Sequence, residues 1–210
     1  GGKTSLIEAL LHEAGAIPKA GKVEEGSTVC DYDPISKELR HSVDATVVHL
    51  EFEGVTVNLI DTPGLSDFLG RGLACMPAAD MGLLVVDPKT GVDPVFRRLA
   101  KVAEERKLPR RVAINKIDRG DELSEAIEAI KDFLGPVVRP LDLPARHGAS
   151  VVDCFENEKG ESDLGDVASF HSQLVDQVVE VDEKLMEQYL DGKVASVDEL
   201  HDPFEKALRE

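Results

Sequence analysis

The chain has 210 residues, with 24 Lys and Arg against 41 Asp and Glu, so its formal net charge is −17. This balance argues against non-specific binding to nucleic acids by long-range attraction, although it leaves docking on RNA through a local patch open. Hydrophobic residues make up 42% of the chain, which is typical of a globular protein with room for one good core and an attached subdomain.

The cysteines and the apolar runs indicate the compartment. Cys30, Cys75 and Cys154 are far apart and have no metal-ligand spacing, which is typical of buried small residues in a reducing environment. No apolar run approaches the length of a membrane span, and no signal-peptide pattern opens the sequence. We therefore expect a cytoplasmic protein with no membrane partner.

The N-terminus reads Gly1-Gly2-Lys3-Thr4-Ser5 and is followed by apolar residues at helical spacing. Gly-Lys-Thr is the end of a phosphate-binding loop. In such a loop, backbone N–H groups surround a phosphate, lysine contacts the β- and γ-oxygens, and the hydroxyl binds Mg²⁺. A flexible terminus that happens to contain these residues is the competing interpretation, and this stretch by itself does not decide between them.

A loop and a hairpin are predicted next. Residues 14–43 have little periodicity and scattered Gly and Pro, which predicts a long, mobile loop. Apolar and polar residues alternate over residues 46–53 and 55–60, and a tight turn at Glu53-Gly54 separates the two runs. This pattern predicts a β-hairpin.

The second strand of this hairpin ends in Asp61-Thr62-Pro63-Gly64-Leu65. An α/β sheet delivers a carboxylate to its ligand-binding edge in this way. From such a position Asp61 can hold a metal ion through water, and the Gly64 N–H can face a phosphate.

Strands and helices then alternate with short connections, which predicts an α/β domain with a mainly parallel sheet flanked by helices. We expect this domain to span residues 1–146. Its buried strands are predicted over residues 82–86 and 111–114. Its amphipathic helices are predicted over residues 93–107 and 122–134.

The pattern changes after Pro144, and we expect a small α+β subdomain over residues 147–210. A short strand near residue 151 and a polar loop over residues 157–165 precede acidic helices. The acidic side chains are interpreted as a solvated face, and a protein-docking surface is the alternative. The helices are predicted over residues 167–189 and 197–209, with acidic residues Asp176, Glu180, Asp182, Glu183 and Glu187.

Asn115-Lys116-Ile117-Asp118 directly follows the second buried strand, at the same expected sheet edge as Asp61. The Asp118 carboxylate can accept both guanine N1–H and N2–H, a pair of donors that adenine lacks. Asn115 can fix the other polar edge of the base, and the Lys116 stem can lie on the ring. An ATP-using phosphate-loop enzyme such as a kinase predicts no such motif, so Asp118 disfavours that alternative.

These three motifs stand in the order and spacing of the translational GTPases. Within that family the chain resembles elongation factor G, and most of all the elongation factor G-like proteins. The tail, including residues 151–153 and the acidic helices, is similar to the insert subdomain of elongation factor G. The resemblance implies a P-loop NTPase G domain that binds GTP or GDP with Mg²⁺. It also implies that this domain switches conformation on the ribosome.

The resemblance singles out two further residues. Ser42 falls near the family's Mg²⁺-binding switch threonine, which would make Thr4, Ser42 and, through water, Asp61 the metal-site residues; a solvated loop serine is the alternative. Leu65 stands where elongation factor G has the histidine that positions the attacking water, so no catalytic residue is identified. Losing such a group typically costs about 10²–10⁴ in rate. A weakened GTPase and a GTP-binding regulatory or scaffold module with little turnover both stay open.

The resemblance also implies parts that this sequence does not contain. These are the strand and the first half of the phosphate loop, a final Ser-Ala guanine-contact motif, and RNA-binding domains. We therefore expect the sequence to be part of a longer protein. We also expect its sheet to have a gap, because the strand before the phosphate loop is central in this fold.

Overall fold

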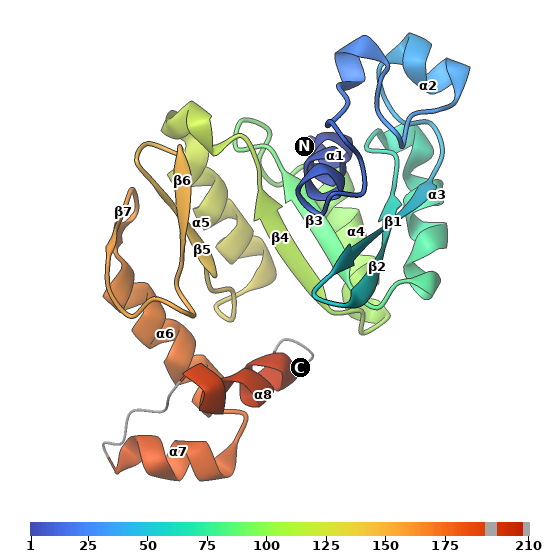
Figure 1. Cartoon of the computed structure of the whole chain (residues 1–210). Helices are drawn as coiled ribbons and strands as arrows, with labels where there is room; N and C mark the ends of the chain where they lie inside the picture. Colours follow the sequence, from blue (N-terminus) through green and yellow to red (C-terminus); the bar gives the residue numbers. More distant parts are fainter. Residues whose placement is uncertain (192–196, 208–210) are drawn as a thin grey trace. The chain divides into compact units, whose positions relative to one another are not determined.

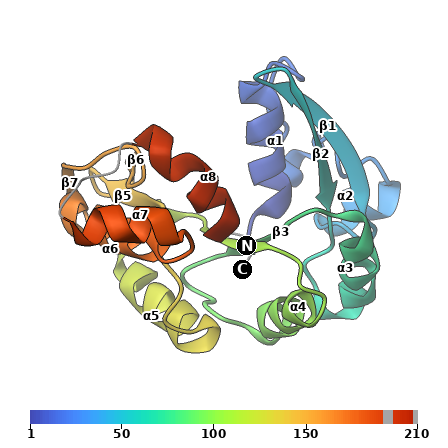
Figure 2. The same ribbon diagram turned by 90° about the horizontal axis from the view of Figure 1, so that it is seen from below.

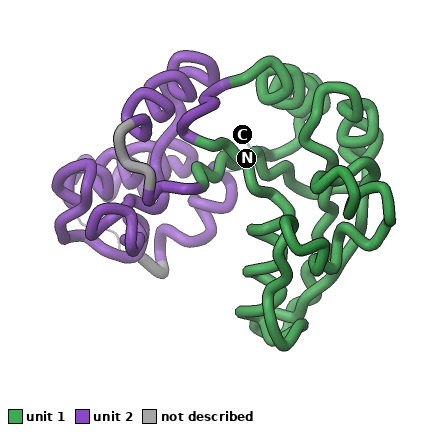
Figure 3. The backbone as a smooth tube through the Cα atoms, turned by 90° about the horizontal axis from the view of Figure 1, so that it is seen from above, with its two compact units in different colours: residues 1–87, 93–115 green, residues 88–92, 116–210 purple. Residues whose placement is uncertain are grey.

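The computed structural model describes residues 1–191 and 197–207 of the chain (Figure 1). The chain folds into two compact units, shown in different colours in Figure 3. The first contains residues 1–87 and 93–115, and the second contains residues 88–92 and 116–210. This division groups residues by their contacts, and the expected boundary at residue 146 stays a prediction.

The first unit contains the predicted hairpin. Strands β1 (Thr46–Phe52) and β2 (Val55–Asp61) pair antiparallel, with Thr46 opposite Asp61. Glu53 and Gly54 between them have φ angles of 50° and 80°, the left-handed conformations that a two-residue hairpin turn requires. The hairpin prediction is therefore confirmed.

Helix α1 (Lys3–Glu13) packs along this hairpin (Figure 2). Leu11 of α1 is buried together with Val48 and Leu50 of β1, and Ile7 packs against the same cluster. The alternation of β1 turns Val48 and Leu50 inward, so one face of the hairpin supports the helix.

The prediction of a structureless loop over residues 14–43 is wrong. The structure has a 3₁₀ turn, η1 (Val23–Glu25), and a helix, α2 (Pro34–Leu39). The Asp33 side chain caps α2 by accepting the Ile35 N–H at 2.7 Å, and Pro34 stands at the first helical position. A capping aspartate followed by proline is a local helix-start signal, and it does not appear in the long-range periodicity of the sequence.

A buried carboxylate on α1 orders the same segment. Glu8 is fully buried, and its two oxygens accept the backbone N–H groups of Gly21 and Val29 at 2.7 and 2.6 Å. These bonds join residues far apart in the sequence, so no local pattern predicts them.

Replacing Glu8 by Ala leaves both part-buried N–H groups without their partner. We expect the free energy of unfolding to fall by roughly 2–4 kcal/mol, since hydrogen bonds to a charged group contribute about 1.5–3 kcal/mol each. Urea unfolding would measure this loss, with Glu13→Ala on an exposed position of α1 as the control. An equal, small effect of the two substitutions would contradict the role of Glu8.

The rest of the first unit contains a β-α-β element. Strands β3 (Gly82–Val86) and β4 (Arg110–Ile114) are parallel, and α4 (Pro94–Glu105) between them packs on β3. The predicted elements here are confirmed within two residues at each end. A short helix, α3 (Leu69–Cys75), packs on α4 between two 3₁₀ turns, η2 (Ser66–Phe68) and η3 (Met76–Ala78).

The expected mainly parallel sheet is not confirmed. Among the strands that the structure describes, β3–β4 is the parallel pair, and β1–β2 forms a separate sheet. The expected gap in the sheet stays a prediction. The coarser expectation of alternating strands and helices holds.

The second unit begins with a 3₁₀ helix, η4 (Ile117–Glu122), and α5 (Leu123–Leu134). Two antiparallel hairpins follow. The second overlaps the predicted polar loop of residues 157–165, so that prediction is wrong in part. The hairpin strands are β5 (Asp142–Ala145) with β6 (Ser150–Asp153), and β7 (Glu161–Ser162) with β8 (Gly165–Asp166).

Three helices complete the second unit: α6 (Val167–Val179), α7 (Glu183–Leu190) and α8 (Val197–Ala207). Phe155 is buried among residues of these helices and stacks on Phe204 with ring centroids 4.4 Å apart. The predicted end of the last helix at residue 209 lies outside the described residues. None of the described helices is long and apolar enough to cross a membrane.

The acidic residues of α6 and α7 are exposed, including Asp176, whereas Asp182 at the start of α7 is half-buried. These two have structural roles: Asp182 caps α7 by accepting the Leu185 N–H at 3.0 Å, and Asp176 accepts the hydroxyl of Tyr189. The interpretation of a solvated face therefore fits the remaining acidic side chains. Asp182 has the further role of capping α7.

Candidate functional site

Three oxygen-bearing side chains meet at the end of β2. Asp61 is 2% exposed, and its Oδ2 accepts the hydroxyl of Thr4 from the first turn of α1 at 2.6 Å. Ser42 Oγ lies 3.3 Å from Thr4 Oγ1. The sequence singled out all three residues, and the fold brings them together from three separate elements.

The other oxygen of Asp61, Oδ1, is buried and has no hydrogen-bond partner among the described protein atoms. Burial raises the pKa of the Asp61 carboxyl, while the hydrogen bond from Thr4 and the charge of Lys3 oppose that rise. A buried carboxylate oxygen without a donor is costly, and carboxylate and hydroxyl oxygens are the ligands that Mg²⁺ prefers. The residues present therefore fit a bound magnesium ion.

Lys3 and Gly64 lie together beside this group. A Cβ added at Gly64 would lie 2.7 Å from Lys3 Nζ, so the absence of a side chain there leaves room for the ammonium group. Gly2 caps α1 in the left-handed conformation, with φ 87°, which glycine adopts most readily. Ser5 is exposed in the first turn of α1. The N-terminus of α1 and the Lys3 ammonium group thus present positive charge near Asp61, an arrangement suited to a phosphate.

Asn115 ties the end of β4 to the start of the chain. Its Nδ2 donates to the carbonyl oxygen of Gly1 at 3.0 Å, and its backbone N–H donates to Val86 O at 2.8 Å. A Cβ at Gly1 would overlap the carbonyl oxygen of Val85, so Gly1 packs directly on β3. The sequence predicted Asn115 as a base contact and missed its bond to Gly1, because no local pattern links positions 114 residues apart.

Lys116 and Asp118 belong to the second unit. Lys116 has a φ of 61°, a left-handed conformation that is uncommon for a residue with a side chain and that often marks functional sites. The Asp118 side chain is exposed. A Cβ added at Gly148 would lie 2.6 Å from Ile117 O and 3.0 Å from Asp118 N, so the turn after β5 lies directly against the peptide that precedes the Asp118 side chain. No pattern in the sequence indicates this contact.

Leu65 follows Gly64 in an extended conformation, with φ −83° and ψ 147°, and its side chain is 46% exposed. It has no polar atom with which to orient water.

Two contacts join the segment around Ser42 to the residues after Leu65. The rings of His41 and Phe68 lie 6.5 Å apart, and Arg71 forms an ion pair with Asp44 at 3.5 Å. These contacts flank Ser42 on both sides along the chain, so the two segments are held together next to the Thr4–Asp61 pair.

A glycine-lysine-threonine helix start beside a buried strand-end aspartate, with Asn-Lys-Ile-Asp after a parallel strand, defines a P-loop GTP-binding domain. The family model described as the elongation factor Tu GTP binding domain matches residues 1–198, and the chain belongs to this family.

The chain is also similar to individual proteins of this family. The chain is 36% identical over 222 residues to an elongation factor G-like protein of Mycobacterium tuberculosis, an alignment that covers 99% of this chain and 31% of that protein. It is 33% identical over 170 residues to peptide chain release factor 3 of Symbiobacterium thermophilum, covering 79% of this chain and 32% of that protein. These matches confirm the predicted translational GTPase family.

A solved structure agrees with the fold. A crystal structure of a protein from Thermus thermophilus matches with a TM-score of 0.88 and 35% identity, covering 99% of this chain and 34% of that one. The chain thus spans about a third of the length of the proteins that it matches.

Proposed function

We propose that this GTP-binding domain binds GTP and GDP together with Mg²⁺ and couples hydrolysis of GTP to a conformational switch linked to the ribosome. The observation that carries the proposal is the meeting of Thr4, Ser42 and Asp61 around an unpartnered, buried carboxylate oxygen beside Lys3. When bound, Mg²⁺ would neutralise charge on the phosphate oxygens.

The residues of the first unit divide into two roles. Thr4 and Ser42 would hold the metal ion through their hydroxyl oxygens, and Asp61 would hold it through water. The positive N-terminus of α1 and the Lys3 ammonium group attract the phosphates. The proposed phosphate-binding residues are Gly1, Gly2, Lys3, Thr4, Ser5, Asp61 and Gly64.

Guanine is proposed to be read by Asn115, Lys116 and Asp118. The Asp118 carboxylate accepts two hydrogen bonds from the base, and its exposure in the second unit leaves it available for that role. Asn115 has a second task in this proposal, because its bond to the Gly1 carbonyl steadies the phosphate loop.

The contacts around Ser42 support the switch. A metal ion bound by the Ser42 hydroxyl would fix residues 41–44, and the contacts His41–Phe68 and Asp44–Arg71 connect these residues to the segment after Gly64. Loss of the γ-phosphate would then release both segments together, as in other nucleotide-dependent switches.

A second candidate function is a GTP-binding regulatory or scaffold module with little turnover. Leu65 favours it, since an exposed aliphatic side chain neither orients nor deprotonates water. The two candidates share the binding site and differ in the rate of hydrolysis.

The wider context is also proposed. The relatives named elongation factor G-like protein and peptide chain release factor 3 support a ribosomal partner in the cytoplasm. We propose a G domain over residues 1–146 and an insert subdomain over residues 147–210, with the exposed acidic faces of α6 and α7 available to a protein partner.

GTP turnover by the natural protein that carries this sequence, measured with and without ribosomes, tests the proposal. Ribosome-stimulated phosphate release supports the coupled switch. GTP binding without stimulated release supports the regulatory module instead, and absence of GTP binding overturns both.

Replacing Asp61 by Asn is expected to have opposite effects on the stability of the fold and on GTP binding. The amide oxygen can still accept the Thr4 hydroxyl, while the buried negative charge is removed. We expect a higher urea midpoint than the parent in the absence of nucleotide, because burial disfavours the charged carboxylate. We also expect weaker Mg²⁺-dependent GTP binding. A lower midpoint together with unchanged GTP affinity would contradict the metal-site assignment.

A further inference from the structure

The turn between β5 and β6 is held by a carboxylate from the next hairpin. Arg146, His147 and Gly148 have φ angles of 55°, 58° and 75°, three left-handed residues in succession. The N–H groups of His147 and Gly148 donate to Asp163 Oδ1 and Oδ2 at 3.0 and 2.8 Å. These bonds, that of His147 first, lower the pKa of the Asp163 carboxyl.

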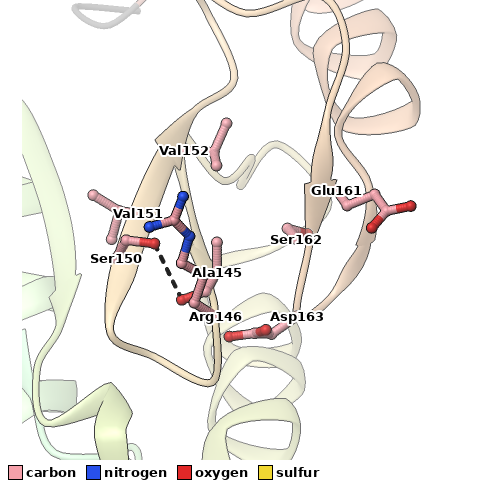
Figure 4. Close-up of a pocket in the computed structure, with 8 residues that line it drawn as sticks. All are labelled: Ala145, Arg146, Ser150, Val151, Val152, Glu161, Ser162 and Asp163. Carbon is pink, nitrogen blue, oxygen red and sulfur yellow. Dashed lines mark hydrogen bonds between the residues drawn. The ribbon is translucent and has the colours of Figure 1, made fainter.

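Asp163 is itself fixed in place. It stands in the turn between β7 and β8, and its backbone N–H donates to Pro144 O on β5 at 2.8 Å. Figure 4 shows Asp163 beside Arg146 at the end of the β5–β6 hairpin, in a pocket that both residues help to line. The side chain and the backbone of Asp163 therefore both bind the β5–β6 hairpin.

The same turn also contacts the peptide that joins Ile117 and Asp118. Because a Cβ at Gly148 would come within 3.0 Å of Ile117 O and Asp118 N, the Gly148 backbone is packed tightly on this peptide. If the turn moved, the peptide that joins Ile117 and Asp118 would no longer be held in the same position. The contacts thus form a continuous path from Asp163 through residues 147–148 to Asp118.

We propose that Asp163 is a positioning residue for guanine nucleotide, which sets the place of Asp118 through the turn of residues 146–148. This inference rests on the proposed function, in which Asp118 reads the base. It follows that moving Asp163 away from the turn of residues 146–148 speeds nucleotide release, so a partner that binds this part of the β7–β8 hairpin can act on the nucleotide.

The test measures GDP release and base discrimination in the natural protein. For Asp163→Ala we expect fluorescent GDP to dissociate about tenfold faster. We also expect the ratio of GDP to IDP affinity to fall, because IDP lacks the 2-amino group that Asp118 contacts. Glu161→Ala removes a like charge from the same pocket and is expected to leave both quantities unchanged.

Two further variants keep the test decisive. Asp163→Asn retains the side-chain size and can be measured in place of Asp163→Ala if that variant does not fold. We expect its GDP release rate to lie between those of the parent and Asp163→Ala. Asp166→Ala removes the cap of α6, where the carboxylate accepts the Ala168 N–H at 3.1 Å, and reports what a loss of stability alone does to release.

The outcomes separate the two proposals. Failure of the parent protein to bind GDP overturns the proposed function and this inference with it. If the parent binds GDP, and a folded Asp163 variant shows the same release rate and the same GDP to IDP ratio, the positioning role alone is overturned. A purely structural role predicts that Asp163→Ala behaves like Asp166→Ala, with base discrimination intact.

Discussion

Replacing Asp118 by Asn is expected to lower the affinity for GTP and GDP by about 10²–10³-fold and to shift the base preference toward xanthine. In the proposed site the Asp118 carboxylate would accept two donors of guanine, and hydrogen bonds to a charged group contribute about 1.5–3 kcal/mol each. Asparagine offers one acceptor and one donor. It therefore loses a bond to the guanine 2-amino group and can donate to the carbonyl oxygen that xanthine carries at the same position.

Calorimetric titration of GDP and XDP into parent and variant measures this change. Asp132→Asn makes the same charge change at an exposed position of α5 and serves as the control. Unchanged preference for guanine in the Asp118 variant would show that the base is recognised elsewhere.

Replacing Leu65 by His is expected to raise ribosome-stimulated GTP turnover by about 10²-fold or more. A positioned acid–base side chain contributes typically 10²–10⁴ in rate, and Leu65 supplies no such group. The side chain is 46% exposed and its backbone is extended, so an imidazole can be accommodated at little cost in stability.

Single-turnover phosphate release on ribosomes measures the gain, and Leu65→Met controls for the change in side-chain shape. The affinity for GTP should stay within a few-fold of the parent, because Leu65 is not assigned to binding. Parent turnover already equal to that of the histidine variant would refute the view that Leu65 limits hydrolysis.

The parts of the fold that the sequence predicts are those with local causes. The alternation over β1 and β2 and the turn at Glu53-Gly54 are contained in a few consecutive residues, as is the amphipathic pattern of α4. The Gly-Lys-Thr and Asn-Lys-Ile-Asp motifs are short for the same reason. Each motif carries its chemistry within one turn of chain.

The parts that sequence reasoning missed depend on contacts between distant segments. Glu8 orders residues 21–29 from within α1, and Asp163 holds a turn that lies 15 residues earlier in the chain. Separation of the strands into two-stranded sheets likewise depends on pairing between distant strands. Helix α2 is a different case, since its start signal, Asp33-Pro34, is local but stands among scattered glycines and prolines that favour a loop.

Ser42 lies between these two cases. Its position in the sequence predicts that it stands near the family's switch threonine, and a solvated loop serine is the alternative. In the folded chain its hydroxyl lies 3.3 Å from Thr4 Oγ1, next to the buried Asp61. Spacing therefore indicated the position, and the three-dimensional contact supplies the reason to include Ser42 in the proposed metal site.

In the proposed function, the group formed by Lys3, Thr4, Ser42 and Asp61 binds a guanine nucleotide through Mg²⁺. Calorimetric titration of GTP and ATP into the natural protein, with and without Mg²⁺, measures this most directly, with Thr4→Val as the variant that removes one hydroxyl and keeps the side-chain shape. We expect GTP to bind more tightly with Mg²⁺ than without it, ATP to show no saturable binding, and Thr4→Val to abolish most of the Mg²⁺ dependence. Equal binding of ATP and GTP, or GTP binding that is unaffected by both Mg²⁺ and Thr4→Val, would contradict the claim.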